Sequence, residues 1–163
     1  MIADLDSKNA QAQRLERVAA QLDALLSQPQ VALGERSHPG VGEWSVMQVL
    51  GHLAEMIPYW LEHCRRLAAA SGEPPAFGRS LDAPERLAGV ERGASEDLAD
   101  LLSQVDQEIR VAAQTIRQMS PADRLKQGIH ARYGPLTVAQ VIEQFIVAHA
   151  EEHLAQIRAA LRE

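Results

Sequence analysis

Residues 136–157, LTVAQVIEQFIVAHAEEHLAQI, are the stretch from which the fold of this chain can be predicted. Apolar side chains recur there at intervals of three and four, the spacing of an amphipathic helix. Thr137 and Gln140 are placed to form a capping box at its start, and Leu136 and Val141 can pack across that cap as a hydrophobic staple. We therefore expect a helix from this cap to the C-terminus.

A second helix is expected where the same arrangement of residues occurs earlier in the chain. In WSVMQV, residues 44–49, Ser45 can cap a helix and Gln48 can complete the capping box, while the tryptophan and the last valine can form the staple. The apolar periodicity continues to about Ala70. Pro58 lies inside this helix and should kink it or remove one backbone hydrogen bond without necessarily ending it.

Two further stretches have helical periodicity. The first runs from about residues 6–7 to residues 28–29, and another runs from about residue 95 to residue 118. After it, the sequence SPAD at residues 120–123 predicts a short helical turn. No alternating stretch is long enough to predict a strand, although GIHARYGP at residues 128–135 can form a hairpin-like turn.

These elements predict an all-α protein, a bundle of four helices. The connections between the first and second helices, and between the second and third, are about 15 to 25 residues long, whereas tight bundles use loops of roughly 2 to 8 residues. We therefore expect at least one crossover that runs the length of the bundle.

Composition limits the classes of function. The chain has 163 residues, 46% of them hydrophobic, which is enough for one domain (residues 1–163) with its own core. Its net charge is -6 and its basic residues are scattered, which argues against nucleic acid or an anionic membrane as a partner and favours a small-molecule ligand.

The sequence also indicates where the protein works. No apolar run approaches the roughly 18 residues of a membrane span, and residues 1–10 do not resemble a secretion signal. The single cysteine, Cys64, cannot form an internal disulfide and is best explained as a small core residue. We expect a cytoplasmic protein.

Three histidines are candidate metal ligands. A helical wheel places His149 and His153 within a core-facing stripe about 120° wide. Burying two imidazoles without partners costs about 1 to 3 kcal/mol each, and a shared metal ion would satisfy both. His52 has a similar position, about 10 Å from the start of the second helix, and His153 is about 13 Å from the end of the last. If these helices are antiparallel neighbours, the three rings lie at one level.

A purely structural interpretation, without a metal ion, stays open, because histidines in a protein core are usually just hydrogen-bonded. His63 lies about 16 Å along the helix from His52, too far to share an ion, and is expected to be packed or on the surface. His38 and His130 fall in expected loops and should be exposed. Glu55, one turn after His52, is a candidate fourth ligand or a group that supports a ligand.

The sequence HAEEH, residues 149–153, also matches the inverted zinc-protease signature H-x-x-E-H, in which Glu152 would be the general base. Such proteases need another ligand well downstream, and only ten residues follow, so we do not favour this interpretation. Glu152 can instead accept a hydrogen bond from an imidazole N–H or pair with a basic neighbour. Glu151 points away from the stripe and should be solvated.

A pocket beside the histidines would be bordered by loops at one end of the bundle. Tyr59 and Trp60 can line its wall or simply pack. The candidates for its rim are Glu43, Trp44, Phe77 and Arg79.

WSVMQVLGHLAEM together with LTVAQVIEQFIVAHAEEHLAQI resembles the DinB-like superfamily, also called the DinB/YfiT-like metal-dependent hydrolases. The resemblance extends over nearly the whole chain and implies a four-helix bundle of up-down-down-up topology. It maps the family's metal triad onto His52, His149 and His153, with nickel, zinc or a related divalent ion. It also implies a homodimer and thiol-dependent transferase or isomerase chemistry that uses bacillithiol, mycothiol or glutathione.

These observations support a specific hypothesis of function. A divalent ion on the three histidines would bind water or a low-molecular-weight thiol, lower its pKa and present it to an electrophile. Because no unambiguous general base is visible, a thiol S-transferase is more economical than a hydrolase. The alternatives are a non-catalytic, stress-associated metal- or ligand-binding bundle, and a helical dimerisation module without metal.

Overall fold

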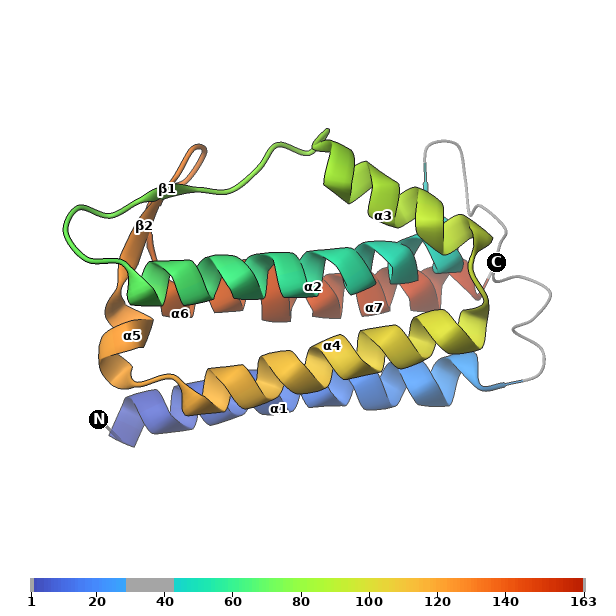
Figure 1. The fold of residues 1–163 in the computed structure, drawn as a ribbon. Helices are drawn as coiled ribbons and strands as arrows, with labels where there is room; N and C mark the ends of the chain where they lie inside the picture. Colours follow the sequence, from blue (N-terminus) through green and yellow to red (C-terminus); the bar gives the residue numbers. More distant parts are fainter. Residues whose placement is uncertain (1, 29–42, 163) are drawn as a thin grey trace.

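The computed structural model describes residues 2–28 and 43–162. Four long helical segments pack side by side as a bundle (Figure 1). Three of them are α1 (Ile2–Leu26), α2 (Val46–Ala69) and α4 (Leu98–Gln118), and the fourth is a continuous run of α6 (Val138–Val141), the π-helical segment η2 (Ile142–Val147) and α7 (Ala148–Ala160). The first and last segments run in one direction, and α2 and α4 run in the other. The expected up-down-down-up bundle is therefore confirmed.

Both predicted capping boxes are present and fix where the two helices that carry the histidines begin. The Gln48 backbone N–H donates to the Ser45 hydroxyl at 3.2 Å, and the Ser45 N–H donates to the Gln48 side chain at 2.9 Å. Thr137 and Gln140 exchange the corresponding bonds at 3.1 and 2.9 Å. Past its cap, α2 continues through Pro58 to Ala69. The two helices lie antiparallel to each other, so positions near the start of α2 face positions near the end of α7.

The connection between α2 and α4 is not the plain loop that its length suggested. It contains a two-residue strand, β1 (Ala76–Phe77), and a helix, α3 (Pro84–Ser95), that lies across the first half of α2 (Figure 1). The two backbones cross closely: a Cβ on Gly93 would lie 2.2 Å from the Met47 carbonyl oxygen, and one on Gly51 would lie 2.4 Å from that of Gly89. Only glycines allow this approach, and it brings α3 down onto the end of the bundle that carries the histidines.

A small sheet lies toward the other end of α2 (Figure 1). After the predicted helical turn, seen as α5 (Pro121–Leu125), β2 (Gln127–His130) and β3 (Gly134–Thr137) form an antiparallel hairpin, which confirms the turn expected at residues 128–135. β1 pairs in parallel with the outer edge of β2, with Phe77 opposite His130. This third strand was not predicted, because two residues carry no periodicity.

The core is apolar and is supplied by all four long segments, with residues such as Leu15, Leu53, Ile109 and Ile146 fully buried. Cys64 belongs to this core, as expected, and burial raises the pKa of its thiol to about 12. Within the described part of the chain, no helix has the length and apolar character needed to cross a membrane.

Candidate metal centre and adjoining cavity

Three histidines meet through their Nε2 atoms. The Nε2 of His149 lies 3.4 Å from that of His52 and 2.9 Å from that of His153, and the candidate ligand atoms of all three lie within 4.8 Å of one another. Metal–imidazole bonds of about 2.0 to 2.1 Å place two ligand nitrogens roughly 2.9 to 3.4 Å apart at right-angle to tetrahedral geometry. Two of the three separations therefore match a shared divalent ion, and His52 and His153 would have to move closer together to complete the site.

The π-helical segment changes how the last helix presents this pair. The expected stripe assumed α-helical spacing throughout and placed both histidines in the middle of the core-facing surface. In the structure, His153 is buried, but the His149 side chain is 35% exposed and faces the cavity. A π turn accommodates one additional residue, so the part of the helix before it is rotated relative to the part after it. The centre is thus buried on one side and open on the other.

All three rings are favoured in the neutral form that metal coordination requires. Desolvation by burial, followed by the positive charge of nearby groups, lowers the pKa of His52 to about 2. Burial is also the main reason that the pKa of His153 falls to about 4. The pKa of His149 is lowered by burial and, second, by the positive charge of Arg86. Neutral imidazoles keep a lone pair for an ion at neutral pH.

Hydrogen bonds alone leave this cluster in conflict. The Nδ1 of His153 lies 2.9 Å from the side-chain oxygen of Gln156, which accepts a hydrogen bond only from a protonated Nδ1, so the Nε2 of His153 carries the lone pair. His149 can donate to that lone pair, but its own Nε2 then has none left for His52. The Nδ1 of His52 has no partner among the described residues. A cation that accepts the lone pairs of all three Nε2 atoms would remove the conflict among those atoms and would place the His52 proton on its Nδ1.

Trp44 and Glu152 border the centre on different sides. The Trp44 ring stacks on His153 with centroids 6.2 Å apart and lies 5.1 Å from His52, so it shields the buried side from water. Glu152 is exposed, and its carboxylate oxygen lies 3.8 Å from the Nδ1 of His149. This distance is too long for a hydrogen bond, although a small side-chain movement would make one.

Glu55 does not join the histidines. Both of its oxygens are held by Arg79, with Nη2 to Oε2 at 2.6 Å, and the pair is largely buried, with side-chain exposures of 17% and 9%. The Arg79 guanidinium also lies 3.8 Å above the ring of Tyr59. Glu55 thus fixes Arg79 at the cavity wall instead of facing the centre.

Two expectations about exposure were wrong. Glu151 is not simply solvated, because Arg14 on α1 donates to both of its oxygens at 2.9 and 2.7 Å and also binds Glu143. His130 is not an exposed loop residue: it lies on β2 and is 8% exposed. Its Nδ1 accepts backbone N–H groups from Arg132 and Tyr133, at 3.1 and 3.3 Å. Both errors arise from tertiary contacts that a local pattern does not contain.

The remaining histidines are separate from the cluster. His63 is half-buried among the rings of Tyr59, Trp60 and Phe77, with centroids 4.5 to 6.2 Å away. It therefore lies outside the group of candidate ligands. His38 lies outside the described residues.

A cavity of about 920 Å³ adjoins the open side of the centre. It lies between α2, the last helix, the hairpin and the segment that leads into α3. Of the rim and wall candidates, Arg79 and Trp60 line it. Phe77 packs against Trp60 and is not among the lining residues, and neither is the exposed Glu43. The side chains that define its chemistry are His52, His149, Arg86, Phe145, His130 and Tyr133.

The sequence analysis did not identify several of these residues. Arg86 lies on α3, a helix in a segment that was expected to be a loop. Two features of the sequence could have revealed this helix: Pro84 in its first turn, and Gly89 and Gly93, four residues apart. Tyr133 is in the recognised turn, but nothing local indicates that the hairpin folds back over α2. Phe145 is brought to the wall by the π segment, for which we find no signal in the sequence.

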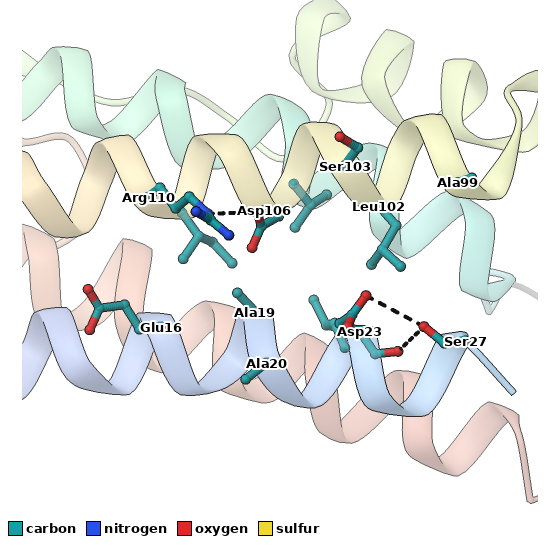
Figure 2. Close-up of a pocket in the computed structure, with 13 residues that line it drawn as sticks. Glu16, Ala19, Ala20, Asp23, Ser27, Ala99, Leu102, Ser103, Asp106 and Arg110 are labelled. Atoms are coloured by element: carbon teal, nitrogen blue, oxygen red, sulfur yellow. Dashed lines mark hydrogen bonds and ion pairs between the residues drawn. The ribbon is translucent and has the colours of Figure 1, made fainter.

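A second pocket of about 740 Å³ lies on another face, between α1 and α4. Figure 2 shows that its polar side chains mostly contact their own helix neighbours: Arg110 donates to Asp106 at 2.8 Å, and Ser27 donates to the Asp23 carbonyl oxygen at 2.5 Å. It contains none of the residues expected to carry chemistry. The cavity beside the histidines is therefore the better candidate site.

Comparisons with known proteins agree with this architecture. The family model described as DinB superfamily matches residues 12–157. Among solved structures, the chain is similar to YfiT from Bacillus subtilis, which is described as a probable metal-dependent hydrolase with an unusual four-helix bundle topology. The TM-score is 0.77 at 19% identity, and the match covers 95% of this chain and 86% of the other. No significant match to a curated protein is found.

Proposed function

Because the chain belongs to the DinB superfamily, we propose that it is a metal-dependent enzyme in which His52, His149 and His153 hold a divalent ion, zinc or nickel. The observation that carries this proposal is the convergence of three neutral Nε2 atoms beside a cavity. Among the described residues no fourth His, Cys, Asp or Glu joins the group. A coordination position would therefore stay open for water or substrate.

The residues around the centre each have a definable task. When bound, the ion would lower the pKa of a coordinated water or thiol and so supply a nucleophile at neutral pH. Gln156 orients the His153 ring through Nδ1, as supporting groups around metal ligands commonly do. Trp44 keeps water from the buried side, and His149 lies at the opening where a substrate would enter.

We favour a low-molecular-weight thiol, such as bacillithiol, mycothiol or glutathione, as the species that becomes the nucleophile. Hydrolysis would call for a base to deprotonate the attacking water. Glu152 is the carboxylate that lines the cavity near His149, and at 75% exposed it has few contacts to hold it over the reacting atoms. A coordinated thiolate needs no such base. An S-transferase is therefore favoured, with a hydrolase as the second possibility.

A non-catalytic metal-binding bundle is the alternative. Such a protein would be expected to close the ion with four or more of its own ligands. The three-residue cluster and the cavity of about 920 Å³ favour turnover instead.

We also propose that the protein forms a homodimer. Large apolar side chains are left exposed in the described chain, among them Leu81, Leu125 and Tyr133, and a second copy could cover them. Sedimentation velocity on the untagged protein tests that assembly.

Metal content per chain is the decisive measurement. Untagged protein should contain or take up close to one zinc or nickel ion per chain by plasma mass spectrometry, and the double variant His149→Ala/His153→Ala should lose it. His63→Asn is the matched control and should keep the ion, because His63 is packed among aromatic rings outside the cluster. No uptake by the native protein would overturn the proposal. An ion bound equally by the double variant would overturn the assigned ligands.

A further inference from the structure

The cavity has one aromatic wall. Trp60 stacks on Phe145 with centroids 4.5 Å apart and planes 19° from parallel, and Phe145 stacks on His130 at 5.2 Å and 20°. Tyr133 extends this wall at 5.9 Å from Phe145 and is 53% exposed. Phe145 is only partly buried. Apolar ring surface left open within a cavity is suited to the flat or apolar body of a small ligand.

The cavity also carries arginine side chains. Arg79 is neutralised by Glu55, but Arg86 forms no ion pair with any carboxylate of the described residues. Arg132 also has no such partner in the described part, and lies 5.5 Å from the Tyr133 ring. The exposed carboxylate of Glu152 is the acidic group lining this cavity. The cavity thus has a surplus of positive charge before any metal ion is considered.

Arg86 is held in place while its charge stays unpaired. One Nη atom donates to the Leu81 carbonyl oxygen at 2.7 Å, and its guanidinium lies 5.1 Å from the Trp44 ring centroid. Trp44 in turn stacks on His153, so Arg86 is anchored next to the histidine cluster. The side chain is half-buried, and burial, with Arg79 as the second cause, lowers its pKa. A partly desolvated guanidinium without a counter-ion is a ready site for a carboxylate, which it binds through paired N–H groups.

We propose that the cavity binds an organic carboxylate with a flat apolar body. Arg86 holds the carboxylate beside the histidine cluster, and Phe145 and Tyr133 contact the body. This inference rests on the proposed function in so far as it places the reactive end of the substrate at the open coordination position. The recognition itself uses residues other than the metal ligands, so it can be tested with and without an ion.

Binding can be followed by the fluorescence of the chain's two tryptophans, because Trp44 lies under Arg86 and Trp60 forms part of the cavity wall. Intrinsic fluorescence, supported by titration calorimetry, would compare three probes: 3-phenylpropionate, its neutral amide and propionate. In the native protein, the aromatic acid should bind at least about tenfold more tightly than the amide, which corresponds to about 1.4 kcal/mol. Propionate should bind more weakly than the aromatic acid.

Variants separate the two contributions. Arg86→Gln should abolish the preference for acid over amide, and Arg86→Lys should retain part of it. Phe145→Leu should weaken the binding of both aromatic probes while leaving their ratio intact. Arg110→Gln removes an arginine on α4, outside this cavity, and should change nothing. Far-ultraviolet circular dichroism of each variant checks that it is folded.

The titrations are run on chelated protein and on zinc-loaded protein. Equal binding of acid and amide by the native protein, or an acid preference that survives in Arg86→Gln, would overturn the inference. A preference that needs zinc and persists in Arg86→Gln would likewise overturn it by assigning the carboxylate to the ion. Acid-selective binding in a protein that takes up no zinc would overturn the proposed function but support this site.

Discussion

At the scale of single residues, the histidine cluster makes the metal-free protein sensitive to acid. The folded-state pKa values of His52 and His153, about 2 and about 4, lie below the ordinary value of 6.5. Below pH 6.5 the unfolded chain therefore binds more protons, so this contribution to stability is complete above that pH and is lost as the pH falls toward the folded-state values.

We predict that the unfolding free energy of chelated protein falls between pH 6.5 and 4.5, by about 1.4 kcal/mol per pH unit for each histidine kept neutral. Urea unfolding at several pH values measures this slope. In His52→Asn the unfolding free energy should fall less steeply with pH, by about 1.4 kcal/mol per pH unit, because one buried neutral histidine is gone. Parallel slopes in the two proteins would contradict the prediction.

The buried ion pair of Glu55 and Arg79 gives a second prediction. Arg79→Met should destabilise the fold by about 3 to 5 kcal/mol, because it leaves a carboxylate that is largely buried without its partner. Adding Glu55→Gln to this variant should recover most of the loss. Urea unfolding of the two variants provides the comparison, and equal stabilities would show that the charge of Glu55 is not the cause.

At the scale of elements, the crossing of α2 and α3 depends on glycine. In an exposed helix, Gly→Ala stabilises by roughly 1 kcal/mol. Gly93→Ala should have the opposite sign and destabilise by about 1 to 3 kcal/mol, because the new methyl group would lie 2.2 Å from the Met47 carbonyl oxygen. Glu91→Ala, an exposed position on the same helix, is the control and should stay within about 0.5 kcal/mol. Thermal unfolding distinguishes the two, and a stabilised Gly93→Ala would refute the close crossing.

The elements also show what local sequence can predict. Both capping boxes were visible because their partners are three residues apart, and they placed the starts of α2 and the last helix correctly. The helix α3 was missed because its buried residues are Gly89, Val90 and Gly93, and glycines produce no apolar periodicity. The strand β1 is set by its pairing with β2, more than 50 residues away, and no local pattern reveals it or the π segment.

At the scale of the whole molecule, an ion bound by α2 and α7 would fasten together two helices that are 97 residues apart at the nearest ligands. Zinc at about a hundred times its dissociation constant should stabilise the fold by about 2.7 kcal/mol. For a chain of this size, that is a rise in Tm of roughly 5 to 11 °C. Differential scanning calorimetry should show the rise in the native protein and not in His149→Ala/His153→Ala. The same rise in both would show that zinc binds elsewhere.

The overall arrangement was more predictable than its details. Helix lengths, long connections and two similar caps were enough for a four-helix bundle, and antiparallel pairing of the second and last helices then brought His52, His149 and His153 to one level. The cavity was not predictable to the same degree. Its residues come from a turn, a strand, a missed helix and the π segment, and their meeting depends on how the connections fold back over α2.

The π segment has a consequence for how this helix can change. Its extra residue lets the two flanking α-helical parts face different partners: residues 138–141 pack toward the hairpin, and residues 148–160 present their histidines to α2. Removing a single residue between them, for instance Gln144, would convert the segment to ordinary α-helix and leave the two halves in the same relative orientation. Pairing residues one by one with a relative that has a straight helix would therefore shift either Phe145 or His149 by one place. Relatives of this chain are best aligned in two separate blocks that meet at this segment.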